Sequence, residues 1–127
     1  MKNILIALSD RDLLRSYGEL LKTDGWNVTE AFDGLQAMKA LADGETKAAM
    51  IDQSLPRAGL KELLLEAEER HTPVVLALSD RWAYETSVKE AGKESGAVAG
   101  KVTYPFPPDE LLSILQTIYC AEEKEGS

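Results

Sequence analysis

The sequence predicts one α/β domain built on a parallel sheet, because short apolar runs alternate five times with segments of helical periodicity. The chain has 127 residues, a length that a single hydrophobic core commonly organises. Apolar residues make up 44% of it, close to the globular average, which argues against a wholly disordered chain. Strands that alternate with helices of this length imply right-handed crossovers, and therefore parallel neighbours.

The apolar runs define five expected strands. In chain order they cover residues 3–8, 26–31, 48–51, 73–78 and 97–102. The first begins the chain, and the second alternates weakly between apolar and polar positions. The run 73–78 is apolar almost throughout, as is typical of a central strand covered on both faces.

Helices are expected between these strands and after the last one. They cover residues 11–23, 34–43, 60–70, 81–95 and 109–121. Asp10 and Asp33 are suitable N-cap residues for the first two, and Gly25 is a suitable stop for the first. In the second helix, Leu35, Met38 and Leu41 are expected on one face. The domain is thus expected over 1–121, with 122–127 as an acidic tail or the start of a linker.

Charge and composition exclude several classes of function. The formal net charge is −8, so the chain offers no basic footprint to nucleic acid or to an anionic membrane. A single cysteine, Cys120, excludes an internal disulfide, and a single histidine, His71, removes most histidine-based metal sites. No apolar run approaches the roughly 18 residues of a membrane span, and the first residues lack a cleavage pattern. A cytoplasmic location is therefore expected.

In a parallel sheet, ligands and chemistry gather at the carboxyl ends of the strands. Here those ends carry Ser9 and Asp10, then Asp52, then Ser79, then Tyr104. Four segments around them, ILIALSDRDLLR, GWNVTEAFDGLQAMKAL, AAMIDQSLPRAGL and TYPFPPDELL, stand in an order and spacing that resembles the receiver domain of two-component response regulators. The resemblance runs from Asn3 to about Tyr119. It implies a flavodoxin-like, doubly wound sheet in the order 2-1-3-4-5 with five helices.

The resemblance also implies a chemistry. In the family, a phosphoryl group passes from a kinase histidine to the aspartate that ends the third strand, and Asp52 matches that aspartate. Mg²⁺ is held there by this aspartate and an acidic pair after the first strand. A lysine that ends the fifth strand and a Ser or Thr that ends the fourth contact the phosphoryl group.

The sequence departs from this pattern at most supporting positions. The acidic pair falls at Leu8 and Ser9, which leaves Asp10 and Asp52 as weak metal candidates. The lysine position falls at Tyr104, and the hydroxyl position falls at Ser79 or, one residue earlier, at Leu78. We therefore expect no resident cofactor, no catalytic residues and no enzyme activity, with Mg²⁺ bound only if the chain is a working receiver that accepts a phosphoryl group on Asp52.

The resulting interpretation is an atypical receiver domain in phosphorelay signalling that acts mainly as a protein-interaction module. One alternative is a working receiver that a histidine kinase phosphorylates on Asp52. Another, of a different class, is a flavodoxin-fold domain that binds a small flavin-like molecule, although no hydroxyl-rich phosphate loop follows the first strand.

A protein partner or a second copy is expected to bind at the fourth helix, the fifth strand and the fifth helix. In a helix, residues two positions apart point about 200° away from one another, so Trp82 and Tyr84 cannot both face the core. The last helix also has more large apolar residues than one buried stripe requires. The candidate interface residues are Trp82, Lys101, Leu112 and Tyr119.

Overall fold

In the computed structural model the chain forms a five-stranded parallel sheet in the order β2-β1-β3-β4-β5, which confirms the expected topology. The structure describes residues 2–52, 60–78, 98–103 and 106–126. The strands are β1 (Asn3–Ala7), β2 (Asn27–Ala31), β3 (Ala48–Asp52), β4 (Val74–Leu78) and β5 (Val98–Thr103). All five lie within one residue of the segments expected from the apolar runs.

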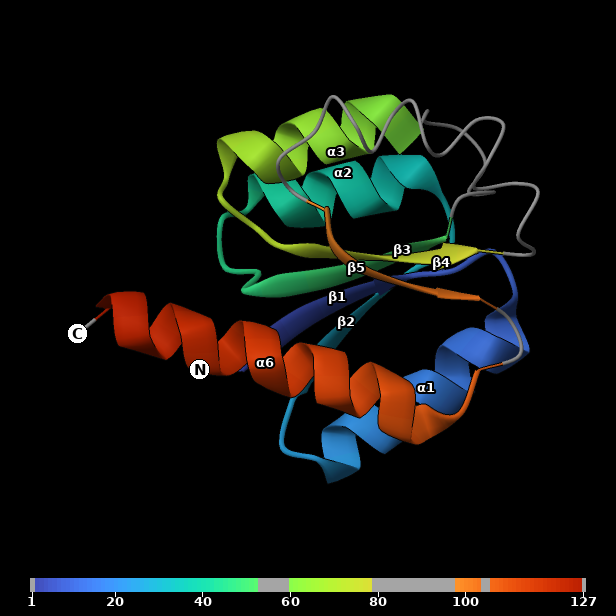
Figure 1. Ribbon diagram of the computed structural model, residues 1–127. Coiled ribbons are helices and arrows are strands. Elements are labelled where there is room, and N and C mark those ends of the chain that lie inside the picture. Colours follow the sequence, from blue (N-terminus) through green and yellow to red (C-terminus); the bar gives the residue numbers. More distant parts are fainter. Residues whose placement is uncertain (1, 53–59, 79–97, 104–105, 127) are drawn as a thin grey trace.

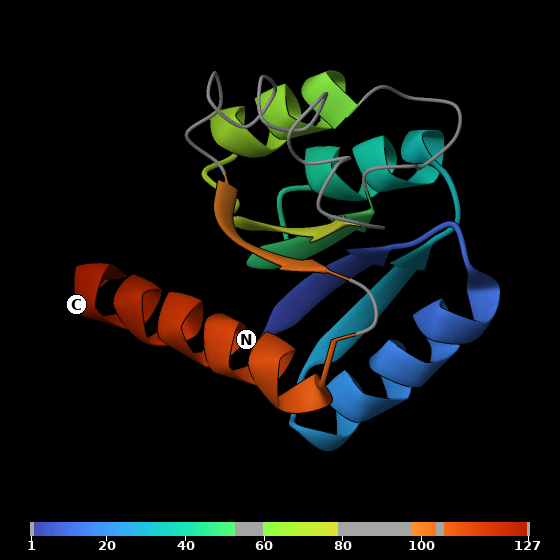
Figure 2. The ribbon, with the colours of Figure 1, turned by 45° about the vertical axis from the view of Figure 1, so that its right-hand side comes forward.

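Helices cover both faces of the sheet (Figure 1). The described helices are α1 (Arg11–Thr23), α2 (Gly34–Ala42), α3 (Leu60–Glu69) and α6 (Pro108–Gly126). Figures 1 and 2 show α2 and α3 on one face and α1 and α6 on the other. The helix expected at 81–95 lies outside the described residues.

Strand alternation divides the interior into two cores. On β1, Ile4 and Ile6 join the core beneath α1 and α6, as does Leu8 directly after the strand, whereas Leu5 and Ala7 join the core beneath α2 and α3. The same alternation continues on β3, where Ala48 and Met50 belong to the first core. A sheet covered on both faces explains why its central strands are apolar almost throughout.

The helix starts follow the predicted caps. The Asp10 carboxylate accepts hydrogen bonds from the backbone N–H groups of Asp12 and Leu13, at 2.9 and 3.2 Å. The Asp33 carboxylate accepts one from the Gln36 N–H at 2.9 Å. Each cap supplies a partner for amides that a helix leaves unpaired in its first turn, and this fixes where α1 and α2 leave the carboxyl edge of the sheet.

Of the three apolar residues expected on one face of α2, Leu41 is fully buried, whereas Leu35 is 57% exposed. The buried stripe instead consists of Gly34, Ala37 and Leu41. Leu35 and Leu41 are six residues apart, which at about 100° per residue turns their side chains roughly 120° away from one another. Leu35 therefore lies on the flank of the buried stripe and faces solvent.

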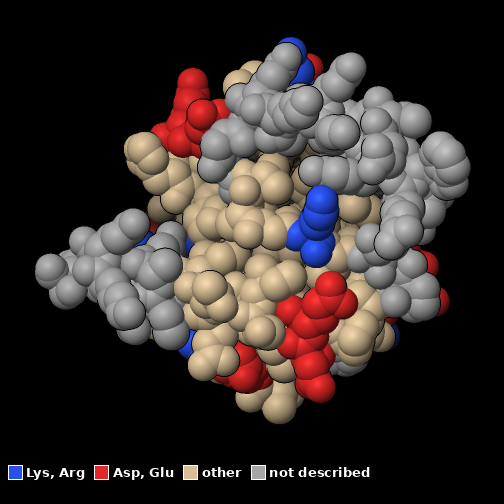
Figure 3. All heavy atoms as spheres, in the orientation of Figure 1, with Lys and Arg blue, Asp and Glu red and all other residues tan. Residues whose placement is uncertain are grey.

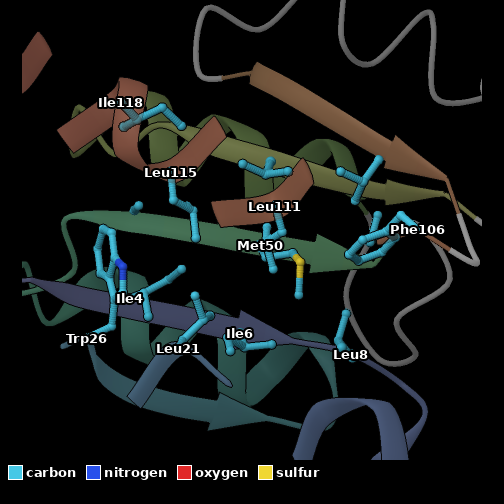
Figure 4. Packing of buried hydrophobic residues seen from close by; sticks show 14 of the residues in the cluster. Ile4, Ile6, Leu8, Leu21, Trp26, Met50, Phe106, Leu111, Leu115 and Ile118 are labelled. Atoms are coloured by element: carbon cyan, nitrogen blue, oxygen red, sulfur yellow. The ribbon is translucent and has the colours of Figure 1, made fainter. Parts of the chain in front are cut away.

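Helix α6 runs to Gly126 and so continues past Ala121, where the sequence predicted its end. Most of its large apolar side chains pack against the core of the domain. Leu111, Leu115 and Ile118 are buried in the core, and Leu112, Ile114 and Tyr119 are partly buried against it. Figure 4 shows the buried three facing the sheet, and Figure 2 shows the carboxyl end of α6 extending past the strands.

Candidate functional site

Asp52 is the last residue of β3 and lies at the carboxyl edge of the sheet. It follows Met50 in the strand alternation, so its side chain emerges on the face that α1 and α6 cover. Only 5% of the residue is exposed. A carboxylate so little exposed needs hydrogen-bond partners, because burying an unpaired charge is costly.

Ser9 supplies two of those partners. Its hydroxyl lies 3.0 Å from Asp52 Oδ2 and donates to it, and its backbone N–H lies 3.4 Å from the same oxygen. Strands β1 and β3 are paired in register, with Ala7 opposite Ile51. The two positions after Ala7 therefore pass directly beside Asp52, which explains the contact.

Leu8 belongs to the core and not to the site. It is fully buried, and its side chain packs with Ile6 and the other residues beneath α1 and α6 (Figure 4). Its backbone N–H donates to the Ala31 carbonyl at 3.2 Å, which ties the ends of β1 and β2 together. The position that matches half of the family's acidic pair is thus filled by an apolar side chain.

The side chains beside Asp52 do not fit a Mg²⁺ site of the family's kind. Mg²⁺ takes oxygen ligands in near-octahedral geometry, with carboxylates among the protein's contributions. The Leu8 side chain has no oxygen atom, and the Ser9 hydroxyl donates its hydrogen bond to Asp52. The Asp10 Oδ1 atom is the N-cap acceptor of α1. Within the described ranges, no three Asp, Glu, His or Cys side chains form a metal-binding group.

Two residues at the rim of this site were missed by the sequence interpretation. Arg11 is the first residue of α1, and its guanidinium carbon lies 4.7 Å from the centroid of the Phe32 ring. Phe32 directly follows β2, and its N–H donates to Gln36 Oε1 at 2.8 Å. Both follow strands that end at one edge of the sheet. Their place shortly after the ends of β1 and β2 is the sequence feature that could have identified them as residues near the site.

The remaining predicted residues fall in three groups. Ser79, Trp82 and Tyr104 lie outside the described residues. Lys101 lies on β5 and is exposed, as expected for a residue of an outward-facing surface. Leu112 and Tyr119, on α6, are partly buried.

Tyr119 belongs to an aromatic cluster at the opposite edge of the sheet from Asp52. Its ring packs edge to face with Trp26, with centroids 5.9 Å apart. The Lys2 ammonium lies 5.4 Å from each ring centroid. A lysine ammonium within about 6 Å of both ring centroids adds a cation–π attraction to the packing of α6.

Comparison with known proteins shows which chains this one resembles in sequence and in fold. No protein-family model matches the chain. The chain is 32% identical over 121 residues to the transcriptional regulatory protein CpxR of Klebsiella pneumoniae, and 30% identical to CpxR of Escherichia coli. Each alignment covers 93% of this chain and 49% of CpxR, so the chain spans about half the length of these relatives.

Solved structures show the same fold. The receiver domain of the Francisella response regulator 1452 superposes with a TM-score of 0.81 at 22% identity, over 96% of this chain and 99% of that one. A CheY-like receiver domain from Methanospirillum hungatei gives 0.78 at 24% identity, over 98% of each chain. TrrA from Thermotoga maritima, solved in complex with Mg²⁺ and BeF, gives 0.78 at 19% identity, over 93% of this chain and 99% of that one.

The five-stranded parallel sheet in the order β2-β1-β3-β4-β5 is the fold that the chain shares with these receiver domains. The chain has this receiver-domain fold, and it is similar in sequence to about half the length of CpxR. In the described part of the chain, no helix is long and apolar enough to cross a membrane.

Proposed function

We propose that this receiver domain acts in two-component signalling mainly as a protein-interaction module, without efficient phosphorylation of Asp52. The observation that carries the proposal is the contact between Ser9 and Asp52, in which a neutral hydroxyl occupies the place of a metal-binding carboxylate. On this proposal the domain is not an enzyme, holds no resident metal and keeps one conformation at the Asp52 site.

Electrostatics gives the size of the effect. Two unit charges about 4 Å apart interact by roughly 4 kcal/mol at an effective dielectric near 20. Phosphorylation adds negative charge beside a carboxylate that is 5% exposed. Without a divalent cation, several such attractive terms are missing from the transition state, and each 1.4 kcal/mol or so lost slows the reaction about tenfold.

For the interaction surface we propose the face formed by β5 and α6, together with the predicted fourth helix. Lys101 is exposed on β5, and Leu112 is partly buried on α6. Figure 3 looks onto this side of the molecule and shows a largely uncharged area in its middle, with few Lys, Arg, Asp or Glu side chains. A face of this kind fits a second copy or a protein partner better than a nucleic acid.

The phosphorylation part is tested by incubating the protein with acetyl phosphate and Mg²⁺ and measuring its intact mass. We expect the mass to stay that of the unmodified chain. The alternative, a working receiver that a histidine kinase phosphorylates, predicts a phosphorylated species that disappears in Asp52→Ala. That result would refute the proposal.

The interaction part is tested by sedimentation across a concentration series. Lys101→Glu and Leu112→Glu should weaken self-association or partner binding while the circular dichroism spectrum stays that of the wild type. Asp52→Asn should leave association unchanged. If Asp52→Asn abolishes association and the two surface variants retain it, the state of the Asp52 site controls binding and the proposal is wrong.

A further inference from the structure

The rim of the Asp52 site carries a guanidinium group that the fold holds in place. Arg11 lies over the Phe32 ring at 4.7 Å, and the Phe32 backbone is itself fixed by its hydrogen bond to Gln36. A guanidinium stacked on an aromatic face keeps its N–H donors at its edge, where they suit an oxyanion. The stack thus orders a flexible side chain before any ligand arrives.

A second arginine lies one turn further along α1. Arg15 is four residues from Arg11, and residues at this spacing are neighbours on one helix face, with Cβ atoms about 5–6 Å apart. Both arginines are exposed, and neither forms an ion pair with an acidic side chain in the described part of the chain. Arg11 has a like charge four residues away, and an anion bound between the two arginines would contact both, although Glu19, four residues after Arg15, offsets part of the positive charge of Arg15.

We propose that Arg11, ordered by Phe32 and supported by Arg15, is an oxyanion-binding site at the rim of the domain. Its ligand class is a carboxylate or a phosphate group, with two oxygens that a guanidinium can contact at once. This goes beyond the proposed function, because it does not depend on whether Asp52 accepts a phosphoryl group.

The acidic groups nearby reduce the affinity without removing the site. Asp10 Oδ1 accepts from the amides of Asp12 and Leu13, which directs that carboxylate onto the helix start. Asp12 follows Arg11 by one residue, so its side chain points about 100° away around the helix. The Asp33 carboxylate accepts from the Gln36 N–H. Glu19 is four residues from Arg15, and Glu30 Oε1 would lie 3.3 Å from a Cβ placed at Gly18, three residues beyond Arg15, so both carboxylates lower the affinity of the arginine pair for an anion. We therefore expect millimolar binding.

The test is an NMR titration with inorganic phosphate in one arm and acetate in the other, at constant ionic strength. The signals to follow are the Arg11 side-chain Nε–H and the Phe32 amide. A saturable shift with phosphate alone assigns the site to phosphate groups, and one with acetate assigns it to carboxylates. No saturation with either anion up to about 50 mM, well above millimolar affinity, overturns the proposal.

Variants separate this site from general charge effects. Arg11→Gln should weaken binding at least about fivefold, and Arg11→Lys by less, because it keeps the charge but loses the two-pronged donor. Phe32→Leu should weaken binding about two- to threefold by removing the stack. The matched control is Arg70→Gln, since Arg70 is an exposed arginine that is already paired with Glu66 on α3. Equal weakening in Arg70→Gln and Arg11→Gln would overturn the proposal.

The titration is repeated in Asp52→Asn, which cannot be phosphorylated at that position. Binding should be unchanged or tighter there, because one carboxylate near the rim is removed. Loss of binding in Asp52→Asn would place the anion at Asp52 and overturn the rim site. Acetyl phosphate and intact mass test the proposed function separately, so either idea can fail while the other stands.

Discussion

His71 and Gly25 occupy the same structural position at the ends of two different helices. Each follows its helix with a positive φ, +56° at His71 and +93° at Gly25. Each is bracketed by the same pair of hydrogen bonds. At α3 these run from the His71 N–H to the Glu68 carbonyl and from the Thr72 N–H to the Ala67 carbonyl. This is the Schellman arrangement, which normally places glycine in the left-handed position.

We predict that His71→Gly stabilises the domain. A side chain in the left-handed region costs about 1–2 kcal/mol, and part of that gain is offset by the greater freedom of glycine in the unfolded chain. The expected net gain is about 0.5–1 kcal/mol in the free energy of unfolding, measured by urea denaturation.

The matched control for this prediction is Gly25→Ala. A Cβ at Gly25 would meet no atom within 4 Å, so any loss there reports the backbone alone. We expect a loss of about 1 kcal/mol. If His71→Gly lowers stability while Gly25→Ala has no effect, the left-handed conformation is not what limits these helix ends.

Local patterns predicted most of the fold, and long-range packing decided the rest. The caps at Asp10 and Asp33 and the stop at Gly25 were predictable, because each depends on a residue's own preferences. Leu35, Met38 and Leu41 were expected on one face of α2, but of the three only Leu41 is fully buried, since composition alone does not show which of several possible stripes a helix buries.

The site was predictable only in part. Asp52 was identified by its place at the end of a strand. Ser9 was treated as a missing ligand, although it is a donor to Asp52. Sequence alone did not show that contact, because it depends on the register of β1 against β3. The pairing of Arg11 with Phe32 likewise depends on how α1 leaves the sheet.

The second prediction concerns pH. Burial raises the pKa of the Tyr17 hydroxyl above its ordinary value of 10.0, because the interior disfavours the phenolate. The ring stacks on Phe106 with centroids 4.8 Å apart. The stability that this shift provides is present below pH 10 and is lost as the pH rises through the folded-state pKa.

We therefore expect the free energy of unfolding of the wild type to fall more steeply above pH 10 than that of Tyr17→Phe. Urea denaturation of both proteins from pH 8 to 11 measures this, and the difference between them removes the contribution of the lysines. Parallel curves for the two proteins would mean that the Tyr17 hydroxyl reaches water in the folded state.

The third prediction concerns the hydrogen bond between Ser9 and Asp52. Ser9→Ala removes the hydroxyl but keeps the backbone N–H, so one of the two contacts to Oδ2 is lost. A hydrogen bond to a charged group contributes about 1.5–3 kcal/mol, and we expect a loss toward the lower end because Ser9 itself is exposed. Urea denaturation at pH 7 gives the value.

A double-mutant cycle with Asp52→Asn isolates the pair. We expect Ser9→Ala to lower the free energy of unfolding less in the Asp52→Asn background than in the wild type, with a coupling energy of about 1 kcal/mol. Ser16→Ala is the control, since Ser16 is an exposed serine on α1 and should show no coupling. A coupling energy near zero for Ser9 would contradict the geometry described for the site.

The last prediction is that one substitution at Ser9 creates a Mg²⁺ site beside Asp52. The Ser9 Oγ atom already lies 3.0 Å from Asp52 Oδ2, so an aspartate at position 9 places a second carboxylate beside the first. Two carboxylates with bound waters are a common way for proteins to hold Mg²⁺. Leu8→Asp is not equivalent, because Leu8 is fully buried in the core.

Without metal, Ser9→Asp should be less stable than the wild type, because like charges meet and a hydrogen bond is lost. Mg²⁺ should then restore stability by about 1.4 kcal/mol at ten times its dissociation constant. Urea denaturation with 0 and 20 mM MgCl₂ measures this, with ionic strength held constant by NaCl. Ser9→Asn, which is similar in size but neutral, should not respond, and neither should the wild type. A saturable Mg²⁺ response of the wild type that disappears in Asp52→Asn would show that the hydroxyl of Ser9 is no obstacle to the metal, and the proposal of an unphosphorylated receiver would lose its main support.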